Sequence, residues 1–127
     1  MAKTEIINEE KLGKVAGLYS QGIKAGGFIF TTQIGNVAGG DLIGPGMYEQ
    51  AIQSLKNIGY ILSVEGADLS DIVKCTIYIT DMNDYDELNR AYKEIMSKPY
   101  PARACVQVSR LSPGSKVEME VVAYCKS

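Results

Sequence analysis

The chain has 127 residues, a length that predicts one domain with a single hydrophobic core. Its composition is 46% hydrophobic and 22% charged, as in ordinary globular proteins, and its formal net charge is −2. No run of lysine or arginine gives a basic stripe, which argues against a nucleic-acid partner, and no apolar run is long enough for a membrane span.

Histidine is absent, and the three cysteines, Cys75, Cys105 and Cys125, lie far apart in the chain. These facts exclude Ser-His-Asp triads, Cys-His pairs and paired-histidine nucleases built from this chain alone, and they argue against structural zinc. Any chemistry must use carboxylates, arginine, lysine, tyrosine, cysteine, backbone groups or water. The odd number of cysteines and the lack of a signal-like segment predict a protein of the reducing cytoplasm.

The first predicted elements form a hairpin. Residues 20–24 and 28–34 are typical of strands, and Ala25-Gly26-Gly27 between them is a turn signal. The glycine-rich segment 35–46 then predicts a loop, with a short strand at Leu42 and Ile43.

A helix is predicted from about Met47 to Glu65, where apolar residues recur on one helical face and Gly66 follows as a stop signal. Gly59 lies on that face and predicts close packing. The inward residues are Ala51, Ile52, Leu55, Ile58, Gly59 and Leu62.

The next strand is predicted at 73–80, and its inward residues are Val73, Cys75, Ile77 and Ile79. Asp84 and Glu87 have the spacing of a capping box, which predicts that a second helix starts there. The inward residues of this helix are Leu88, Ala91, Tyr92 and Ile95.

The last two strands are predicted at 102–109 and 116–124, joined as an antiparallel hairpin. Matching their apolar faces places Cys105 roughly across from Glu118 and Arg103 roughly across from Glu120, all on the second face of the sheet. The prediction is one α+β domain over 1–127, with a mixed sheet and two helices on one face. The other face, of mixed polarity, is predicted to be a subunit interface with a cleft at its edge.

Two interpretations of Arg103 compete. A cross-strand ion pair with Glu120 would contribute at most about 1 kcal/mol if exposed, and the pattern alone favours this interpretation somewhat. The functional interpretation is that Arg103 binds a carboxylate through parallel N–H donors while a nearby glutamate activates water. Likewise Glu118 is most simply a solvated strand residue, and Cys105 a small buried hydrophobic residue.

Several segments of the chain resemble the Rid (YjgF-like) family, the reactive intermediate deaminases, over about residues 19–123. The most specific is Pro101-Ala102-Arg103-Ala104-Cys105-Val106 followed by Val117-Glu118-Met119-Glu120. Others are Tyr19-Ser20-Gln21-Gly22 and Thr80-Asp81-Met82-Asn83-Asp84-Tyr85, with Asn89 and Tyr92 following.

The resemblance implies a chorismate-mutase-like α+β fold and a homotrimer with three clefts between subunits. It implies hydrolysis of imines and enamines such as 2-aminoacrylate to 2-keto acids and ammonium, without metal or cofactor. Arg103 would bind the carboxylate of the small-molecule substrate, and Glu118 would orient or activate water. The backbone at Cys105 would contact the reacting end of the substrate, and Tyr19 and Asn89 would lie in the pocket.

The chain departs from the family pattern at two places. Gly17-Leu18 stands where the family usually has Gly-Pro. The segment Thr31-Thr32-Gln33-Ile34-Gly35 is one residue shorter than the usual Thr-Ser-Gly-Gln-Ile-Pro, so either Thr31 or Thr32 is predicted at the pocket. This change keeps a second hypothesis open, in which the cleft binds 2-keto acids or related carboxylates without turnover and has a regulatory role. A third, RNA cleavage, is disfavoured by the net charge and the missing histidine.

Overall fold

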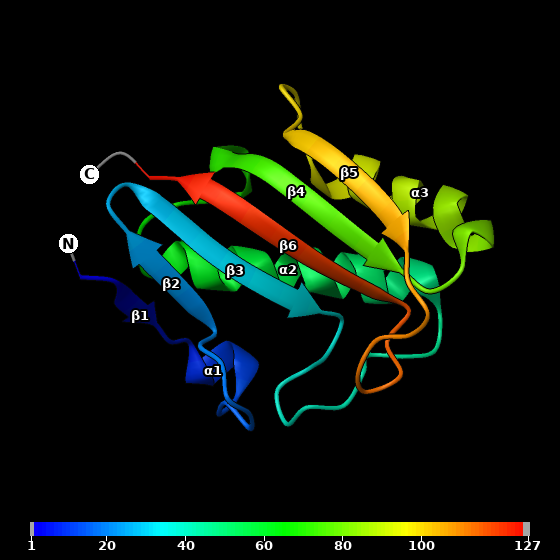
Figure 1. Ribbon diagram of the computed structural model, residues 1–127, viewed down its shortest axis with the longest axis horizontal. Coiled ribbons are helices and arrows are strands. Elements are labelled where there is room, and N and C mark those ends of the chain that lie inside the picture. Colours follow the sequence, from blue (N-terminus) through cyan, green and yellow to red (C-terminus); the bar gives the residue numbers. More distant parts are fainter. Residues whose placement is uncertain (1, 126–127) are drawn as a thin grey trace.

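The structure is a computed structural model that describes residues 2–125. The predicted domain covers 1–127, of which residues 1, 126 and 127 lie outside the described part. A six-stranded mixed sheet has the strand order β1-β2-β3-β6-β4-β5, and α2 and α3 cover one of its faces (Figure 1). The strands and α-helices are β1 (Thr4–Ile6), α1 (Glu9–Leu12), β2 (Gly22–Ala25), β3 (Phe28–Ile34), α2 (Met47–Val64), β4 (Ile72–Ile79), α3 (Tyr85–Ile95), β5 (Ala102–Gln107) and β6 (Val117–Tyr124). The predicted mixed sheet with two helices on one face is confirmed.

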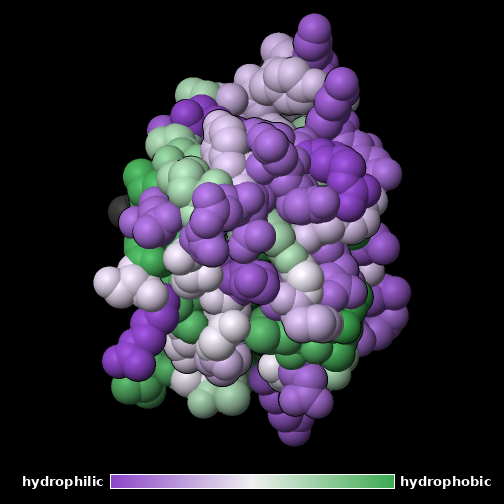
Figure 2. Space-filling view, turned by 90° about the vertical axis from the view of Figure 1, so that its right-hand side faces the viewer, coloured by the Kyte–Doolittle hydropathy of each residue, from purple (hydrophilic) through white to green (hydrophobic). Residues whose placement is uncertain are grey.

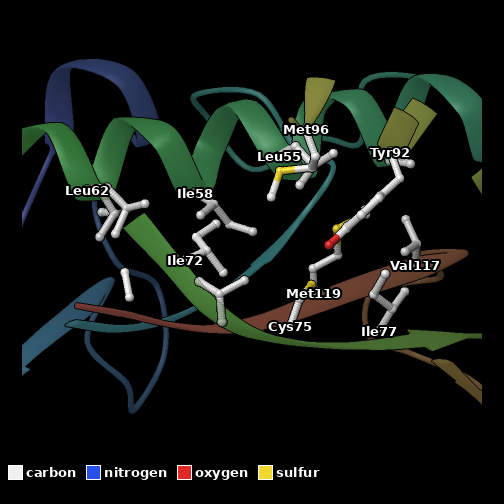
Figure 3. Packing of buried hydrophobic residues seen from close by; sticks show 14 of the residues in the cluster. Leu55, Ile58, Leu62, Ile72, Cys75, Ile77, Tyr92, Met96, Val117 and Met119 are labelled. Atoms are coloured by element: carbon white, nitrogen blue, oxygen red, sulfur yellow. The ribbon is translucent and has the colours of Figure 1, made fainter. Parts of the chain in front are cut away.

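The core lies between the two helices and the sheet (Figure 3). Leu55, Ile58 and Leu62 point from α2 toward the sheet and are fully buried. The sheet contributes the buried residues of β4 and β6 to this core: Ile72, Cys75, Ile77, Ile79, Val117, Met119, Val121 and Ala123. Burying each large apolar side chain stabilises the fold by roughly 1.5–3 kcal/mol. Apolar residues recur every 3.6 residues on the helix and every 2 on the strands, and burying both sets fixes which faces of the two layers pack together.

Two short N-terminal elements were not predicted. β1 pairs antiparallel with β2 and buries only Ile6, and α1 spans four residues. Asn8 begins α1 by accepting a hydrogen bond from the backbone N–H of Lys11 at 3.2 Å. Such short elements contain too few apolar residues to show a period. The predicted strand at Leu42 and Ile43 is a single bridge between Asn36 and Leu42.

The start of β4 differs from the prediction because the strand contains a register shift between Ile72 and Lys74. Strict alternation would place Val73 inward, but Val73 is 47% exposed and Ile72 only 4%. A bulge of this kind inserts one residue and reverses the faces on one side of it. The prediction for Val73 was therefore wrong, and those for Cys75, Ile77 and Ile79 are confirmed.

The predicted terminal hairpin was also wrong. β5 pairs in parallel with β4, and β6 lies between β3 and β4, antiparallel to both (Figure 1). β6 thus forms hydrogen-bonded ladders with β3 and β4, and neither of its edges is left for the predicted pairing with β5. At its start, the backbone N–H of Lys116 donates to the side-chain oxygen of Gln50 in α2 at 2.8 Å.

The capping box predicted at Asp84 and Glu87 was wrong as well. A short 3₁₀ helix, Met82–Asp84, precedes α3, and Asp81 caps it by accepting from the backbone N–H of Asn83 at 2.9 Å. Asp84 makes no side-chain cap bond to α3 and instead pairs with Lys116 at 3.4 Å.

Two glycines, one packed against α2 and one within it, are expected to respond oppositely to substitution by alanine. At Gly35 an added Cβ would lie 2.4 Å from the backbone oxygen of Gln50, so Gly35→Ala must push α2 away from the end of β3. At Gly59 the nearest atom would be 3.8 Å away, which is ordinary contact, so close packing does not require this glycine. We expect Gly35→Ala to lower the free energy of unfolding by about 1–3 kcal/mol and Gly59→Ala to raise it by up to about 1 kcal/mol. Urea denaturation of both variants tests this, and equal effects would contradict it.

Candidate functional site

Arg103 lies on the helix-covered face of the sheet, toward α3. In the parallel ladder it pairs with Cys75, which is buried beneath the helices. The carbon at the centre of its guanidinium lies 4.8 Å from the ring centroid of Tyr92 and 5.8 Å from that of Tyr85. One guanidinium nitrogen, Nη2, donates a hydrogen bond to the Tyr85 hydroxyl at 3.0 Å. Arg103 is therefore held by aromatic side chains.

The ion pair between Arg103 and Glu120 does not form. β4 lies between the two strands, and the ladders place the two side chains on opposite faces of the sheet. Glu120 instead accepts a hydrogen bond from the Tyr78 hydroxyl at 2.7 Å. Within residues 2–125 the ion pairs are Lys24–Glu65, Arg90–Glu87 and Lys116–Asp84. No described carboxylate neutralises Arg103.

A hollow of about 300 Å³ adjoins Arg103, and Asn89 belongs to its lining, so these two predicted site residues come together. The lining consists of Asn89, Tyr92, Lys93, Tyr100, Pro101 and Arg103. Apart from Asn89 and the two cations, it is aromatic or apolar. The lining contains no acidic residue, so the hollow combines a guanidinium that has no acidic partner with apolar walls.

Cys105 lies two residues after Arg103 on the same face of β5 and packs half-buried against the core. Burial raises the pKa of its thiol, and the positive charge of Arg103 opposes this only in part. Burial also raises the pKa of the neighbouring Cys75 thiol to about 12. Both thiols are neutral at physiological pH, which gives no support for thiolate chemistry here.

The remaining predicted residues line a second depression that includes part of the open face of the sheet. Tyr19, Thr31, Thr32 and Glu118 belong to its lining. Tyr19 is 65% exposed, whereas the Thr31 hydroxyl is buried, donates to the backbone oxygen of Gln21 at 2.7 Å and accepts from the Gln33 amide at 2.9 Å. Thr32 points out to solvent. Of the two threonines, only Thr32 has a hydroxyl free of these contacts.

Glu118 is half-buried on this open face. Burial is the main cause that raises the pKa of its carboxyl group, and the negative charge of Glu120 adds to it. A carboxylate with a raised pKa is a stronger base toward water than an ordinary exposed glutamate.

The structure thus divides the predicted site between the two faces of the sheet. Arg103, Asn89 and Cys105 lie on the helix side, and Glu118, Tyr19 and Thr32 lie on the open side. Within one chain, Arg103 and Glu118 do not line the same depression.

The family model described as "Endoribonuclease L-PSP" matches residues 10–125. This chain belongs to that family. Its resemblance to the Rid (YjgF-like) proteins is confirmed, and so is the chorismate-mutase-like α+β fold that the resemblance implied. Among its relatives, a RutC family protein of Pyrococcus abyssi is 41% identical over 131 residues and covers 98% of each chain.

Two further relatives of this chain have informative names. A human protein named 2-iminobutanoate/2-iminopropanoate deaminase is 38% identical over 120 residues, covering 93% of this chain and 88% of the human one. The crystal structure of TdcF of E. coli with bound serine superposes with a TM-score of 0.89 at 34% identity, covering 97% and 99% of the two chains. Deaminases of imines are thus among the relatives of this chain.

Some residues around Arg103 in this L-PSP family member were missed from the sequence. Tyr85 and Tyr92 belong to the segments that resemble the family, but neither was given a role at the site, and Tyr92 was predicted as a core residue. Lys93 and Tyr100 were not singled out. The signal was present in the spacing, because Tyr85 and Tyr92 are seven residues apart and therefore share one helical face. Within residues 2–125, no three acidic or cysteine side chains converge as metal ligands do, and no helix is both long and apolar enough to cross a membrane.

Proposed function

We propose that this chain hydrolyses small 2-imino and enamine acids, such as 2-aminoacrylate, to 2-keto acids and ammonium. The observation that carries the proposal is Arg103, a guanidinium without an acidic partner at the edge of a hollow. A guanidinium binds a carboxylate through two parallel N–H donors. The named human deaminase and the serine bound to TdcF support it, because serine has the same α-carboxylate as a 2-imino acid.

The chemistry asks little of the protein. A protonated imine carbon is already electrophilic, so water held at the right place can add to it. Glu118 takes one proton from the attacking water as the C–O bond forms and passes it to the nitrogen. The C–N bond then breaks as the hydroxyl oxygen forms the C=O bond, and the hydroxyl proton passes through Glu118 to the leaving ammonia, which departs as ammonium. Base catalysis of this kind contributes about 10²–10⁴-fold. Arg103 holds the carboxylate throughout, and no cofactor takes part.

We further propose that the site is shared between subunits of a homotrimer, with Arg103 from one copy and Glu118, Tyr19 and Thr32 from the next. The two groups lie on opposite faces of one chain's sheet, so only a second copy can bring them together. The open face carries large exposed apolar side chains from β3, β5 and β6, namely Phe28, Phe30, Val106 and Tyr124. In contrast, the end of the molecule seen in Figure 2 is mostly hydrophilic with separate hydrophobic patches. The open face is therefore the better interface.

A second candidate is binding of 2-keto acids without turnover. The shortened Thr31–Gly35 segment favours it, because the Thr31 hydroxyl is used inside the chain and cannot also bind a ligand without breaking its bonds. Titration with pyruvate or 2-ketobutyrate, beside an assay with 2-aminoacrylate generated in situ, separates the two: binding without accelerated ammonium release supports this alternative. The family description names RNA cleavage, which the net charge of −2 and the missing histidine do not support.

Subunit mixing tests the shared site. Arg103→Ala chains keep Glu118, and Glu118→Gln chains keep Arg103, so each homotrimer should be inactive while mixed trimers regain complete sites. Random mixing in equal amounts gives a complete pair at about one cleft in four, so we expect about a quarter of the wild-type activity. Mixing Arg103→Ala chains with chains that carry both substitutions is the matched control and should restore nothing. Absence of recovery in hetero-trimers verified by mass would contradict a site shared between chains.

A further inference from the structure

Two tyrosines of α3 contact the same arginine of β5. Tyr85 and Tyr92 are seven residues, or two helical turns, apart and therefore lie on the same face of α3. The Tyr85 hydroxyl accepts a hydrogen bond from Nη2 of Arg103 at 3.0 Å, and the ring centroid of Tyr92 lies 4.8 Å from the centre of the guanidinium. Binding a carboxylate requires the positive charge of Arg103, and neither tyrosine supplies that charge. The contacts of the two tyrosines with Arg103 therefore need a separate explanation.

We propose that Tyr85 and Tyr92 act as a clamp that positions the Arg103 guanidinium for its ligand. The identity of that ligand, a small carboxylate, rests on the proposed function. A guanidinium has five N–H donors arranged as two forked edges that share Nη2. Tyr85 occupies one N–H of Nη2, so one fork stays complete and is the edge that a carboxylate meets. The Tyr92 ring attracts the cation and restricts its swing. An arginine ordered before binding loses less side-chain freedom when the ligand arrives.

The surroundings hold the clamp itself in place. The backbone N–H of Met82, just before α3, donates to the side-chain oxygen of Gln107 at the end of β5 at 2.7 Å. This bond ties the start of α3, and therefore Tyr85, to the strand that carries Arg103. Tyr92 is anchored more deeply: it is 6% exposed and points from the helix layer toward the sheet (Figure 3).

The ring of Tyr92, not its hydroxyl, is the part that the clamp uses. Its buried hydroxyl has no hydrogen-bond partner within residues 2–125. A buried hydroxyl without a partner costs free energy, so the aromatic ring is the part of Tyr92 that stabilises this arrangement. Phenylalanine should therefore replace Tyr92 far better than leucine, which lacks the aromatic face.

The experiment measures the Kd of 2-ketobutyrate by calorimetry for the assembled protein. We expect Tyr85→Phe to weaken binding about three- to tenfold, since one hydrogen bond to the guanidinium is lost. Tyr92→Leu should weaken it about three- to thirtyfold, and Tyr92→Phe should recover most of that loss. Tyr48→Phe is the matched control, because the Tyr48 ring lies 3.7 Å from Arg90 and its hydroxyl is bonded to Glu94, outside the hollow. This control should leave Kd unchanged.

Two further readouts separate a clamp from a merely structural role. In an Arg103→Lys background, which has no fork to orient, Tyr85→Phe should have no additional effect on Kd. Nitrogen-15 NMR should show faster motion of the Arg103 Nε–H in Tyr85→Phe than in wild type, whether or not a ligand binds. Unchanged Kd and unchanged Arg103 motion in Tyr85→Phe overturn the clamp, even if Arg103→Ala abolishes binding. If wild type neither binds 2-ketobutyrate nor hydrolyses 2-aminoacrylate, while Tyr85→Phe still shows the faster Arg103 motion, the clamp stands and the proposed function is overturned.

Discussion

Arg103→Ala is expected to lower kcat/KM for imine hydrolysis by about 10²–10⁴-fold while the protein stays folded. The guanidinium would make two charge-assisted hydrogen bonds to the substrate carboxylate, and each contributes roughly 1.5–3 kcal/mol. Their loss corresponds to that range of rates. The fold should tolerate the change because Arg103 is half-buried, makes no described ion pair and is bonded only to the exposed Tyr85 hydroxyl.

The measurement is steady-state hydrolysis of 2-aminoacrylate generated in situ, with circular dichroism as the check on folding. Arg103→Lys keeps the charge but not the planar fork, and it should fall between wild type and alanine. Arg90→Ala is the matched control: Arg90 is also on a tyrosine ring, but it pairs with Glu87 on the outer surface of α3 and should be dispensable for turnover. Near-normal activity of a folded Arg103→Ala protein would refute the assignment of the site.

The predicted faces of α2 and β6 are confirmed, because periodicity reports directly on burial. The predicted face of β5 was wrong, since Val106 is 44% exposed and Cys105 packs against the core. The inward residues of α2 and β6 follow periods of 3.6 and 2, and nothing interrupts them. At the start of β4 a single inserted residue reversed the alternation, and Val73 became exposed. A bulge leaves no mark in hydrophobicity, since Ile72 and Val73 are equally apolar.

The order of the strands in the sheet could not be predicted from the hydrophobic pattern. The faces of β5 and β6 say which side chains lie together on each strand, but not which strand each one joins. The prediction assumed that strands adjacent in sequence pair, whereas β5 joins β4 through the α3 crossover and β6 enters the centre of the sheet. This difference separates Arg103 from Glu120, and the reversed face of β5 places Arg103 on the helix side.

The identities of the candidate site residues follow from the family resemblance, whereas their arrangement follows only from the three-dimensional structure. Arg103 and Glu118 could be named from the sequence, but their placement on opposite faces follows from long-range pairing. The aromatic contacts of Arg103 were hidden for a related reason. A tyrosine on the inward face of a helix is usually a core residue, and Tyr92 is one, so its second contact with Arg103 depends on which strand lies beneath it.

Glu118→Gln is expected to lower kcat for imine hydrolysis by about 10²–10⁴-fold with little change in KM, because the amide cannot take a proton from water. The same substitution should stabilise the fold at neutral pH. Burial and the charge of Glu120 raise the pKa of Glu118, so the native environment disfavours its charged form. A group with a raised native pKa contributes stability below its unfolded pKa, and that stability is lost as pH rises through the native pKa.

The advantage of Glu118→Gln in the free energy of unfolding should therefore be absent in acid, where both proteins carry a neutral group, and should appear as pH rises past the native pKa of Glu118. Urea denaturation across this range measures it. In wild type, kcat/KM should fall on the acid side at a pH above that of an ordinary glutamate. Glu120→Gln, which removes the neighbouring charge but keeps the base, should move this acid limb to lower pH. A Glu118→Gln protein that keeps its activity would show that Glu118 is not the base. A stability advantage that is greatest in acid would show that the pKa of Glu118 is not raised in the native protein.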